Sequence, residues 1–161
     1  MFTGFFAAGH NCAVARDQHG IVGYLWAFRG EYAVTFDEYG PLSMQAILEP
    51  NAVFTGNAFV RSDSRRRGIF RNLMHYLMRQ YPLGAHFYTW IYRENTASLT
   101  AHWHLGFAPL ATLRLLGLGS RAALWWRPAD SAHWLRAGLR WPTMTMRLHG
   151  AHMTISAPSA R

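Results

Sequence analysis

The order of apolar and polar positions predicts a chain in which strands alternate with two helices. Apolar residues flank a polar turn at residues 16–20, which predicts a β-hairpin over Asn11–Arg29. Residues 51–60 form an apolar run with β-favouring valine and phenylalanine, which predicts a strand. Ile69, Leu73 and Leu77 then recur at helical spacing, so a helix follows that strand.

The same order continues further along the chain. Pro82–Gly84 ends the first helix, Ala85–Tyr92 predicts another strand, and Asn95 is placed to cap a second helix. Residues 107–116 and 121–126 flank a glycine-rich turn, which predicts a closing hairpin.

Residues 31–50 show no regular pattern and are punctuated by glycine and proline. The densest acidic residues of the chain lie here, namely Asp37, Glu38 and Glu49. We interpret the segment as a solvated connection between strands. The alternative is a wall of a binding site, because carboxylates attract a cationic amine.

A basic turn joins the strand at residues 51–60 to the first helix. Arg65, Arg66 and Arg67 precede Gly68 in this turn. The first N–H groups of a helix lack partners and the helix dipole favours negative charge there, so the turn predicts an anion site. Gly68 permits close backbone approach, and arginines suit bidentate phosphate contacts. The predicted ligand is a pyrophosphate.

This segment resembles motif A of the GCN5-related N-acetyltransferases, in which a strand is followed by Arg/Gln-x-x-Gly-x-Gly/Ala and a helix. Residues 65–70 match the arginine and the first glycine, whereas Phe70 stands where the family usually has glycine or alanine. Residues 95–107, from Asn-Thr-Ala-Ser to Leu-Gly-Phe, resemble motif B of the same family. The two motifs also stand in the family's order and at its separation.

The resemblance implies an α/β fold with a mixed, mostly antiparallel sheet that splays at its central strand and carries flanking helices. The N-terminal strand and helices of the family are expected to be missing. A domain of this type would span residues 1–128, followed by a basic, Trp-rich tail over residues 129–161. The implied function is an N-acyltransferase, in the first place an N-acetyltransferase. It would move an acyl group from acetyl-CoA or another acyl-CoA to a small-molecule or peptide amine.

The resemblance also implies how the donor is held. Backbone amides at the end of the central strand would bind the pantetheine arm and polarise the thioester carbonyl. The basic turn and the first turns of both helices would bind the remainder of the donor molecule. The cofactor-binding residues implied in this way are Phe59, Val60, Arg61, Arg65, Arg66, Arg67, Gly68, Ile69, Phe70, Arg71, Asn95 and Ser98.

Two residues are the catalytic candidates. Family members commonly have a tyrosine five residues before the Phe of Leu-Gly-Phe, and His102 stands there. Histidine can carry a proton at neutral pH, so His102 is the expected acid for the leaving thiolate. The family's strand glutamate has no counterpart in residues 51–60, which makes Glu49 the expected base, with Glu94 and Asp37 behind it. An amine that arrives deprotonated needs no strong base.

Charge and composition restrict the partners only in part. The 161 residues carry a formal net charge of +8, all of it from arginine because no lysine occurs. This charge attracts phosphorylated cofactors, nucleic acid and anionic lipid alike. Because the arginines gather where a pyrophosphate would lie, nucleic acid is the less favoured partner. The scattered histidines lack carboxylate or thiol companions at ligand spacing, so no metal is expected.

A single cysteine, Cys12, excludes an internal disulfide, and the apolar N-terminus is neither a convincing signal peptide nor an anchor. A cytoplasmic location is therefore expected. The tail is interpreted as packing on the domain, with a peripheral membrane helix or a partner surface as alternatives, and residues 154–161 are expected to fray. An uncovered sheet edge would favour a homodimer.

Two alternative functions stay open. A long-chain acyltransferase that takes its donor from acyl carrier protein would explain the aromatic tail and Phe70. A non-catalytic CoA-binding module derived from the same fold would explain the missing tyrosine.

Overall fold

The computed structural model describes residues 2–35, 43–118, 121–133, 135–137 and 143–156. The chain forms two compact units, each built from two separate stretches. The first unit comprises Met1–Arg29 and Pro50–Phe107, and the second comprises Gly30–Glu49 and Ala108–Arg161. This division does not coincide with the boundary expected between residues 128 and 129.

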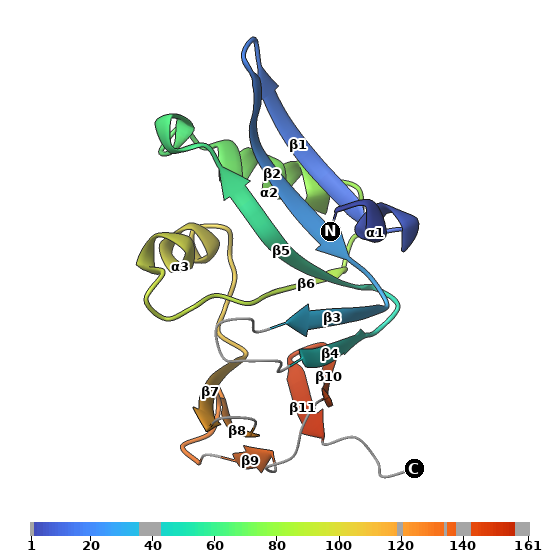
Figure 1. The fold of residues 1–161 in the computed structure, drawn as a ribbon, viewed down its shortest axis with the longest axis vertical. Coiled ribbons are helices and arrows are strands. Elements are labelled where there is room, and N and C mark those ends of the chain that lie inside the picture. The colour runs from blue at the N-terminus through green and yellow to red at the C-terminus, as the bar shows by residue number, and fades with distance from the viewer. Residues whose placement is uncertain (1, 36–42, 119–120, 134, 138–142, 157–161) are drawn as a thin grey trace. The chain divides into compact units, whose positions relative to one another are not determined.

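The first unit is a four-stranded sheet with helices (Figure 1). The sheet order is β1-β2-β5-β6, in which β5 and β6 are parallel and the other pairs are antiparallel. The elements of this unit are α1 (Phe2–Ala7), β1 (Asn11–Asp17), β2 (Gly20–Phe28), β5 (Ala52–Val60), the 3-10 helix η2 (Ser62–Ser64), α2 (Ile69–Met78), β6 (His86–Thr89) and α3 (Thr96–Trp103).

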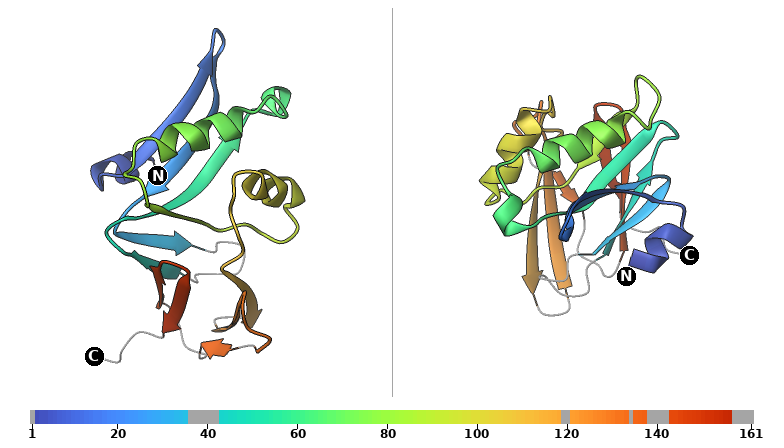
Figure 2. Two further views of the ribbon diagram at one scale, coloured as in Figure 1. Left: turned by 180° about the vertical axis from the view of Figure 1, so that it is seen from behind. Right: turned by 90° about the horizontal axis from the view of Figure 1, so that it is seen from above.

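The helix α2 covers one face of this sheet (Figure 2). Its buried residues Leu73, Met74 and Leu77 share one stripe and pack with Leu25 of β2 and Val53 of β5. Close approach needs a glycine in β2, because a Cβ atom on Gly23 would lie 2.9 Å from the Phe59 carbonyl oxygen and 3.0 Å from Ile69 Cγ2. The parallel β5–α2–β6 connection is thus held by apolar packing.

Aromatic rings join α1 to the sheet. The Phe5 ring lies 5.0 Å from both the Trp26 and the Phe28 ring, measured between centroids. Trp26 and Phe28 are fully buried in β2. The hydrophobic pattern does not predict this helix, because six residues carry too little periodicity to indicate one.

The second unit consists of strands in the part of the chain that is described. One sheet has the order β11-β10-β4-β3, and a second has the order β7-β8-β9. Met44, Ala46 and Leu48 of β4 and Met146 and Leu148 of β10 are buried. The strands are β3 (Glu31–Thr35), β4 (Ser43–Leu48), β7 (Ala111–Leu118), β8 (Arg121–Pro128), β9 (Leu135–Ala137), β10 (Thr143–His149) and β11 (His152–Ser156).

The interpretation of residues 31–50 as a solvated connection is wrong. β3 and β4 form an antiparallel pair there, and β4 also pairs in parallel with β10. Strand β4 alternates buried Met44, Ala46 and Leu48 with half-buried residues, but the apolar Ile47 at a half-buried position hides this period of two in the sequence. Asp37 and Glu38 lie outside the described residues.

The tail is not helical where it is described. It forms β9, β10 and β11, and β10 pairs with both β4 and β11. Residues 154–156, which were expected to fray, belong to β11, whereas residues 157–161 lie outside the described part of the chain.

The mixed α/β class with mostly antiparallel strands is confirmed. The hairpin β1–β2, the strand β5, the helix α2 and the hairpin β7–β8 all lie where the hydrophobic pattern predicted them. Among the described residues, no helix is both long enough and apolar enough to cross a lipid bilayer.

Candidate functional site

Strands β5 and β6 part after four paired residues. The parallel pairs run from Ala52 with His86 to Thr55 with Thr89, and β5 then continues to Val60 beside β2 alone. Directly after the last pair, the β2–β5 register shifts and Asn57 adopts a φ of 46°, which marks a β-bulge. We call the point after Thr55, where β5 and β6 part, the fork. Residues 57–59 are exposed, so β5 presents an open segment beyond the fork.

The direction of one backbone N–H group, that of Val60, follows from the way backbone groups alternate between the two edges of a strand. The Arg61 N–H donates to the Val22 carbonyl oxygen of β2 over 2.8 Å. Because backbone groups alternate between the two edges of a strand, the Val60 N–H and C=O groups point to the edge away from β2. Arg65 Nε donates to that Val60 carbonyl over 3.2 Å. The Val60 N–H is therefore directed to the open edge.

The turn after β5 leads directly into the start of α2. Arg66 and Gly68 have φ angles of 62° and 75°, and Gly68 is the N-cap residue of α2. Intrahelical bonding begins with the Asn72 N–H, which donates to the Gly68 carbonyl over 2.9 Å. The N–H groups of Ile69, Phe70 and Arg71 donate to no acceptor within the described part of the chain. These donors suit an anion.

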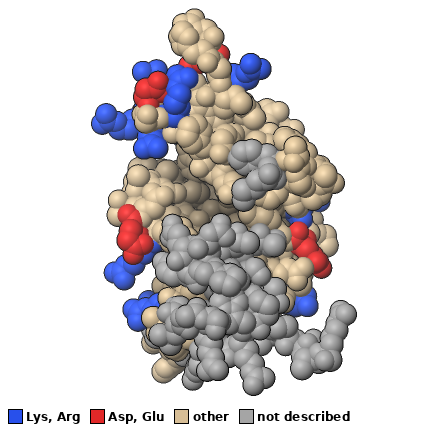
Figure 3. Space-filling model, in the orientation of Figure 1, with Lys and Arg blue, Asp and Glu red and all other residues tan. Residues whose placement is uncertain are grey.

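The arginines around this turn fall into two groups. Arg61 is engaged with two carboxylates, at 3.0 Å to Asp17 and 2.6 Å to Asp63. Its hydrogen bond to Asp63 holds the pKa of that carboxyl below the usual range. The other arginines of the turn are exposed, namely Arg65, Arg66, Arg67 and Arg71. Basic side chains gather near the end of β5 (Figure 3). Arg61 thus braces the turn and Arg65 bonds to the Val60 carbonyl, whereas Arg66, Arg67 and Arg71 are exposed.

The Arg71 side chain lies beside the N-cap of α2. Its Nη2 atom is 3.5 Å from the position that a Cβ atom on Gly68 would take. A guanidinium and the open helix start thereby lie next to each other, which raises the positive potential at one point.

Phe70 and His102 pack against each other. Their ring centroids are 4.9 Å apart, and the centroid of the Phe107 ring lies 5.1 Å from that of His102. His102 is 5% exposed, and its Nδ1 atom lies 2.7 Å from the Ser98 carbonyl oxygen, which makes Nδ1 the protonated nitrogen. Burial lowers the pKa of His102, and the Ser98 bond opposes this only in part. The imidazole is therefore neutral near pH 7.

The start of α3 is capped as expected. The Asn95 Oδ1 atom accepts a hydrogen bond from the Ser98 N–H over 3.1 Å. Ser98 is thus the donor to the cap rather than a cap itself. Its carbonyl and hydroxyl oxygens both lie near His102 Nδ1, at 2.7 and 3.4 Å.

Glu49 belongs to the second unit, whereas His102 and the basic turn belong to the first. The Glu49 Oε1 atom accepts from the Gly150 N–H over 2.9 Å, and Oε2 lies 3.4 Å from His149 Nε2. The carboxylate is 12% exposed and anchors the β10–β11 turn. Of the other base candidates, Glu94 is exposed beside α3 and Asp37 lies outside the described residues.

Two residues at the fork were missed by sequence reasoning. Thr89 Oγ1 donates to the Thr55 carbonyl over 3.0 Å, and Thr55 Oγ1 donates to the Tyr88 carbonyl over 3.2 Å. Each is one hydroxyl within an apolar strand, and its partner lies on a strand more than 30 positions away.

Cys12 is half-buried, and burial raises the pKa of its thiol, which does not favour a thiolate nucleophile.

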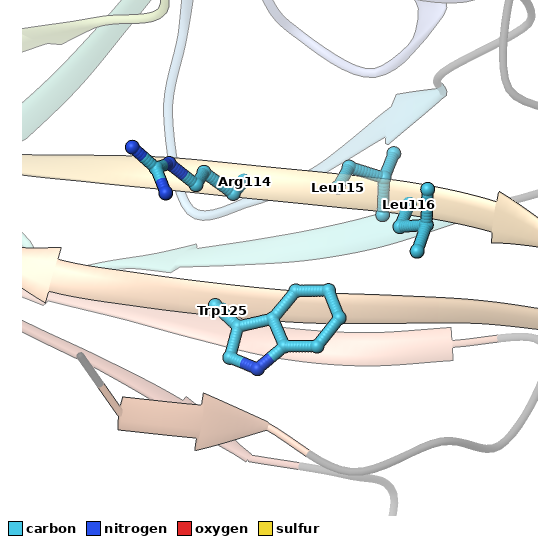
Figure 4. Close-up of a pocket in the computed structure, with 4 residues that line it drawn as sticks. All are labelled: Arg114, Leu115, Leu116 and Trp125. Atoms are coloured by element: carbon cyan, nitrogen blue, oxygen red, sulfur yellow. The ribbon is translucent and has the colours of Figure 1, made fainter.

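A hollow of about 530 Å³ lies in the second unit (Figure 4). It is lined by Arg114, Leu115 and Leu116 of β7 and by Trp125 of β8. These side chains offer no acid, base or nucleophile. Within the described residues, no three His, Cys, Asp or Glu side chains lie together in a metal-binding group.

No protein-family model matches this chain, and no curated protein matches it in sequence. The assignment of a function therefore depends on the geometry described above.

Proposed function

We propose that this protein is an N-acyltransferase of the GCN5-related type, which moves an acyl group from acyl-CoA to an amine. The observation that carries the proposal is the fork in the β5–α2–β6 connection. Two parallel strands part after Thr55, the longer strand leaves an open edge, and a basic turn and an open helix start follow at its end. A strand that parts from its neighbour in this way supports the splayed central strand that the resemblance to motif A implies.

The open edge and the turn suit the two ends of a CoA molecule. An extended pantetheine arm carries amide groups that pair with a strand edge, as a peptide does in β-augmentation. The Val60 N–H is directed to that edge. The helix start and the exposed arginines suit the diphosphate. Gly68 keeps the backbone accessible, because no side chain projects from the N-cap.

Acyl transfer requires that the amine attacks the thioester carbonyl, that the developing oxyanion is stabilised and that the thiolate leaves. A backbone N–H on the open edge near Val60 would stabilise the oxyanion, a contribution of about 3 kcal/mol for one well-placed donor. The amine attacks in its deprotonated form, and its proton passes to solvent. His102 does not supply a proton readily, because it is neutral and enclosed by Phe70 and Phe107.

Two observations favour a second candidate, a CoA-binding module without turnover. The residue expected as the general acid is buried, and the residue expected as the base anchors a turn in the second unit. Such a module would keep the cradle for CoA but would not catalyse transfer.

Two measurements test the proposal. Isothermal titration with acetyl-CoA and with CoA reports binding, and an absence of binding at millimolar ligand would exclude both candidates. Release of free thiol from acetyl-CoA is then followed with a panel of primary amines. Amine-dependent release supports the transferase, whereas binding without release supports the module.

A further inference from the structure

The fork is closed by a reciprocal pair of threonines. Thr55 and Thr89 are partners in the last β5–β6 pair. Thr89 Oγ1 donates to the Thr55 carbonyl over 3.0 Å, and Thr55 Oγ1 donates to the Tyr88 carbonyl over 3.2 Å. Each strand therefore binds a backbone carbonyl of the other strand through a side chain.

These hydroxyls lie where the backbone ladder ends. Beyond the last pair the strands separate. Thr55 is 1% exposed, so its hydroxyl makes its hydrogen bond out of contact with water, where such a bond is stronger. Threonine is also restricted at χ1, which keeps each hydroxyl in place. The pair thus adds two side-chain hydrogen bonds between the strands at the last paired position.

The position of the fork decides what β5 presents. Gly56 and the bulge at Asn57 follow directly after Thr55. A shift of the fork by one residue would move the start of the open edge by about 3.3 Å. A misplacement of about 1 Å already costs a catalytic site much of its rate.

We infer that Thr55 and Thr89 are positioning residues that fix where β5 opens and thereby align its free edge with the pantetheine arm of the donor. The alignment rests on the proposed function, whereas the closure of the fork does not. Neither residue touches the reacting atoms in this scheme, since both act through the β5 backbone.

Amide hydrogen exchange tests the closure of the fork without any ligand. Thr89→Val keeps the branched shape and removes the hydroxyl, and Thr89→Ser restores the hydroxyl. We expect exchange of the β5–β6 amides to become about fivefold faster in Thr89→Val, the effect of one lost hydrogen bond, and to stay near wild type in Thr89→Ser. Thr112→Val, at an exposed position on β7, is the matched control and should leave these amides unchanged. Equal exchange in Thr89→Val and wild type would overturn the inference.

Ligand affinity tests the alignment. Two probes are titrated, CoA and adenosine 3′-phosphate 5′-diphosphate, which lacks the pantetheine arm. We expect Thr89→Val to weaken CoA binding about fivefold and to leave the shorter nucleotide unaffected. An equal loss for both probes would indicate a general structural effect, and no loss for either would show that the fork does not position the arm.

The outcomes separate the two proposals. If wild-type protein binds neither probe, the proposed function fails, and hydrogen exchange still decides whether the threonines close the fork. If Thr89→Val does not fold, Thr55→Val removes the other hydroxyl of the pair and is measured in the same two ways.

Discussion

The rings of Phe70 and His102 lie 4.9 Å apart and join the first turn of α2 to the last turn of α3. Both residues stand where the sequence departs from the family it resembles. Phe70 occupies a position of glycine or alanine, and His102 occupies a position of tyrosine. In this protein the two departures pack together, so the imidazole became part of the core rather than a solvent-facing acid.

Stability should fall in mild acid because of His102. Burial lowers its pKa below the ordinary value of 6.5, so the unfolded chain binds a proton more readily than the folded protein. The stability present above pH 6.5 is therefore lost progressively as the pH falls below that value. Urea unfolding of wild type and His102→Asn from pH 7.5 to 5 measures this. The variant should show a shallower dependence, and parallel curves would contradict the expectation.

Turnover should depend little on His102 if the protein is a transferase. Removal of a general acid costs about 10²–10⁴ in rate, whereas loss of a neutral packing residue should lower kcat by less than about tenfold. Steady-state thiol release by His102→Asn, with the best amine of the panel, decides between these values. A loss of 10² or more, with an unchanged CoA affinity, would restore the histidine as the acid.

The N-cap glycine of α2 should matter for the donor as well as for the fold. Gly68 has a φ of 75°, and alanine in this left-handed region costs about 1 kcal/mol. Gly84 has a φ of 85° and open space around it, which makes Gly84→Ala a matched control for strain. Both variants should lose similar stability in urea. Only Gly68→Ala should weaken CoA binding, by about tenfold, which corresponds to one charged hydrogen bond. Equal affinities would argue against the cradle.

The ion pair between Arg61 and Asp63 should be visible in the titration of Asp63. The hydrogen bond from Arg61 is the largest cause that lowers the pKa of this carboxyl. In Arg61→Gln the pKa of Asp63 should rise toward 3.8, its ordinary value, as measured by NMR titration of the carboxyl carbon. Arg66→Gln is the control and should leave Asp63 unchanged. A similar rise in both variants would mean that general charge, not this pair, is responsible.

Glu49 should contribute to stability and not to chemistry. It accepts the Gly150 N–H over 2.9 Å, and a hydrogen bond to a charged group contributes about 1.5 kcal/mol. Glu49→Ala should therefore unfold at lower urea concentration, and Glu49→Gln, which keeps the oxygen acceptor, should recover most of the loss. Amine-dependent thiol release by Glu49→Gln should match wild type. A normal stability combined with lost turnover would instead identify Glu49 as the base.

Local signals were sufficient for the turn and the two main helices. Gly68 ends up left-handed at the N-cap of α2, and Asn95 caps α3, because both effects depend on residues within a few positions. The hairpin of β1 and β2 is equally local. These elements carry most of the residues that were expected to bind the donor.

The sequence by itself determined the strand, basic turn and helix around Gly68, since neighbouring residues alone decide backbone conformation there. Only the tertiary structure decided the burial of His102, the anchoring of Glu49 and the pair of Thr55 with Thr89. Each of these depends on a partner from another element, and for Glu49 that partner lies 101 positions away. Hydrophobic periodicity indicates which residues are buried in an element, but not which element covers them.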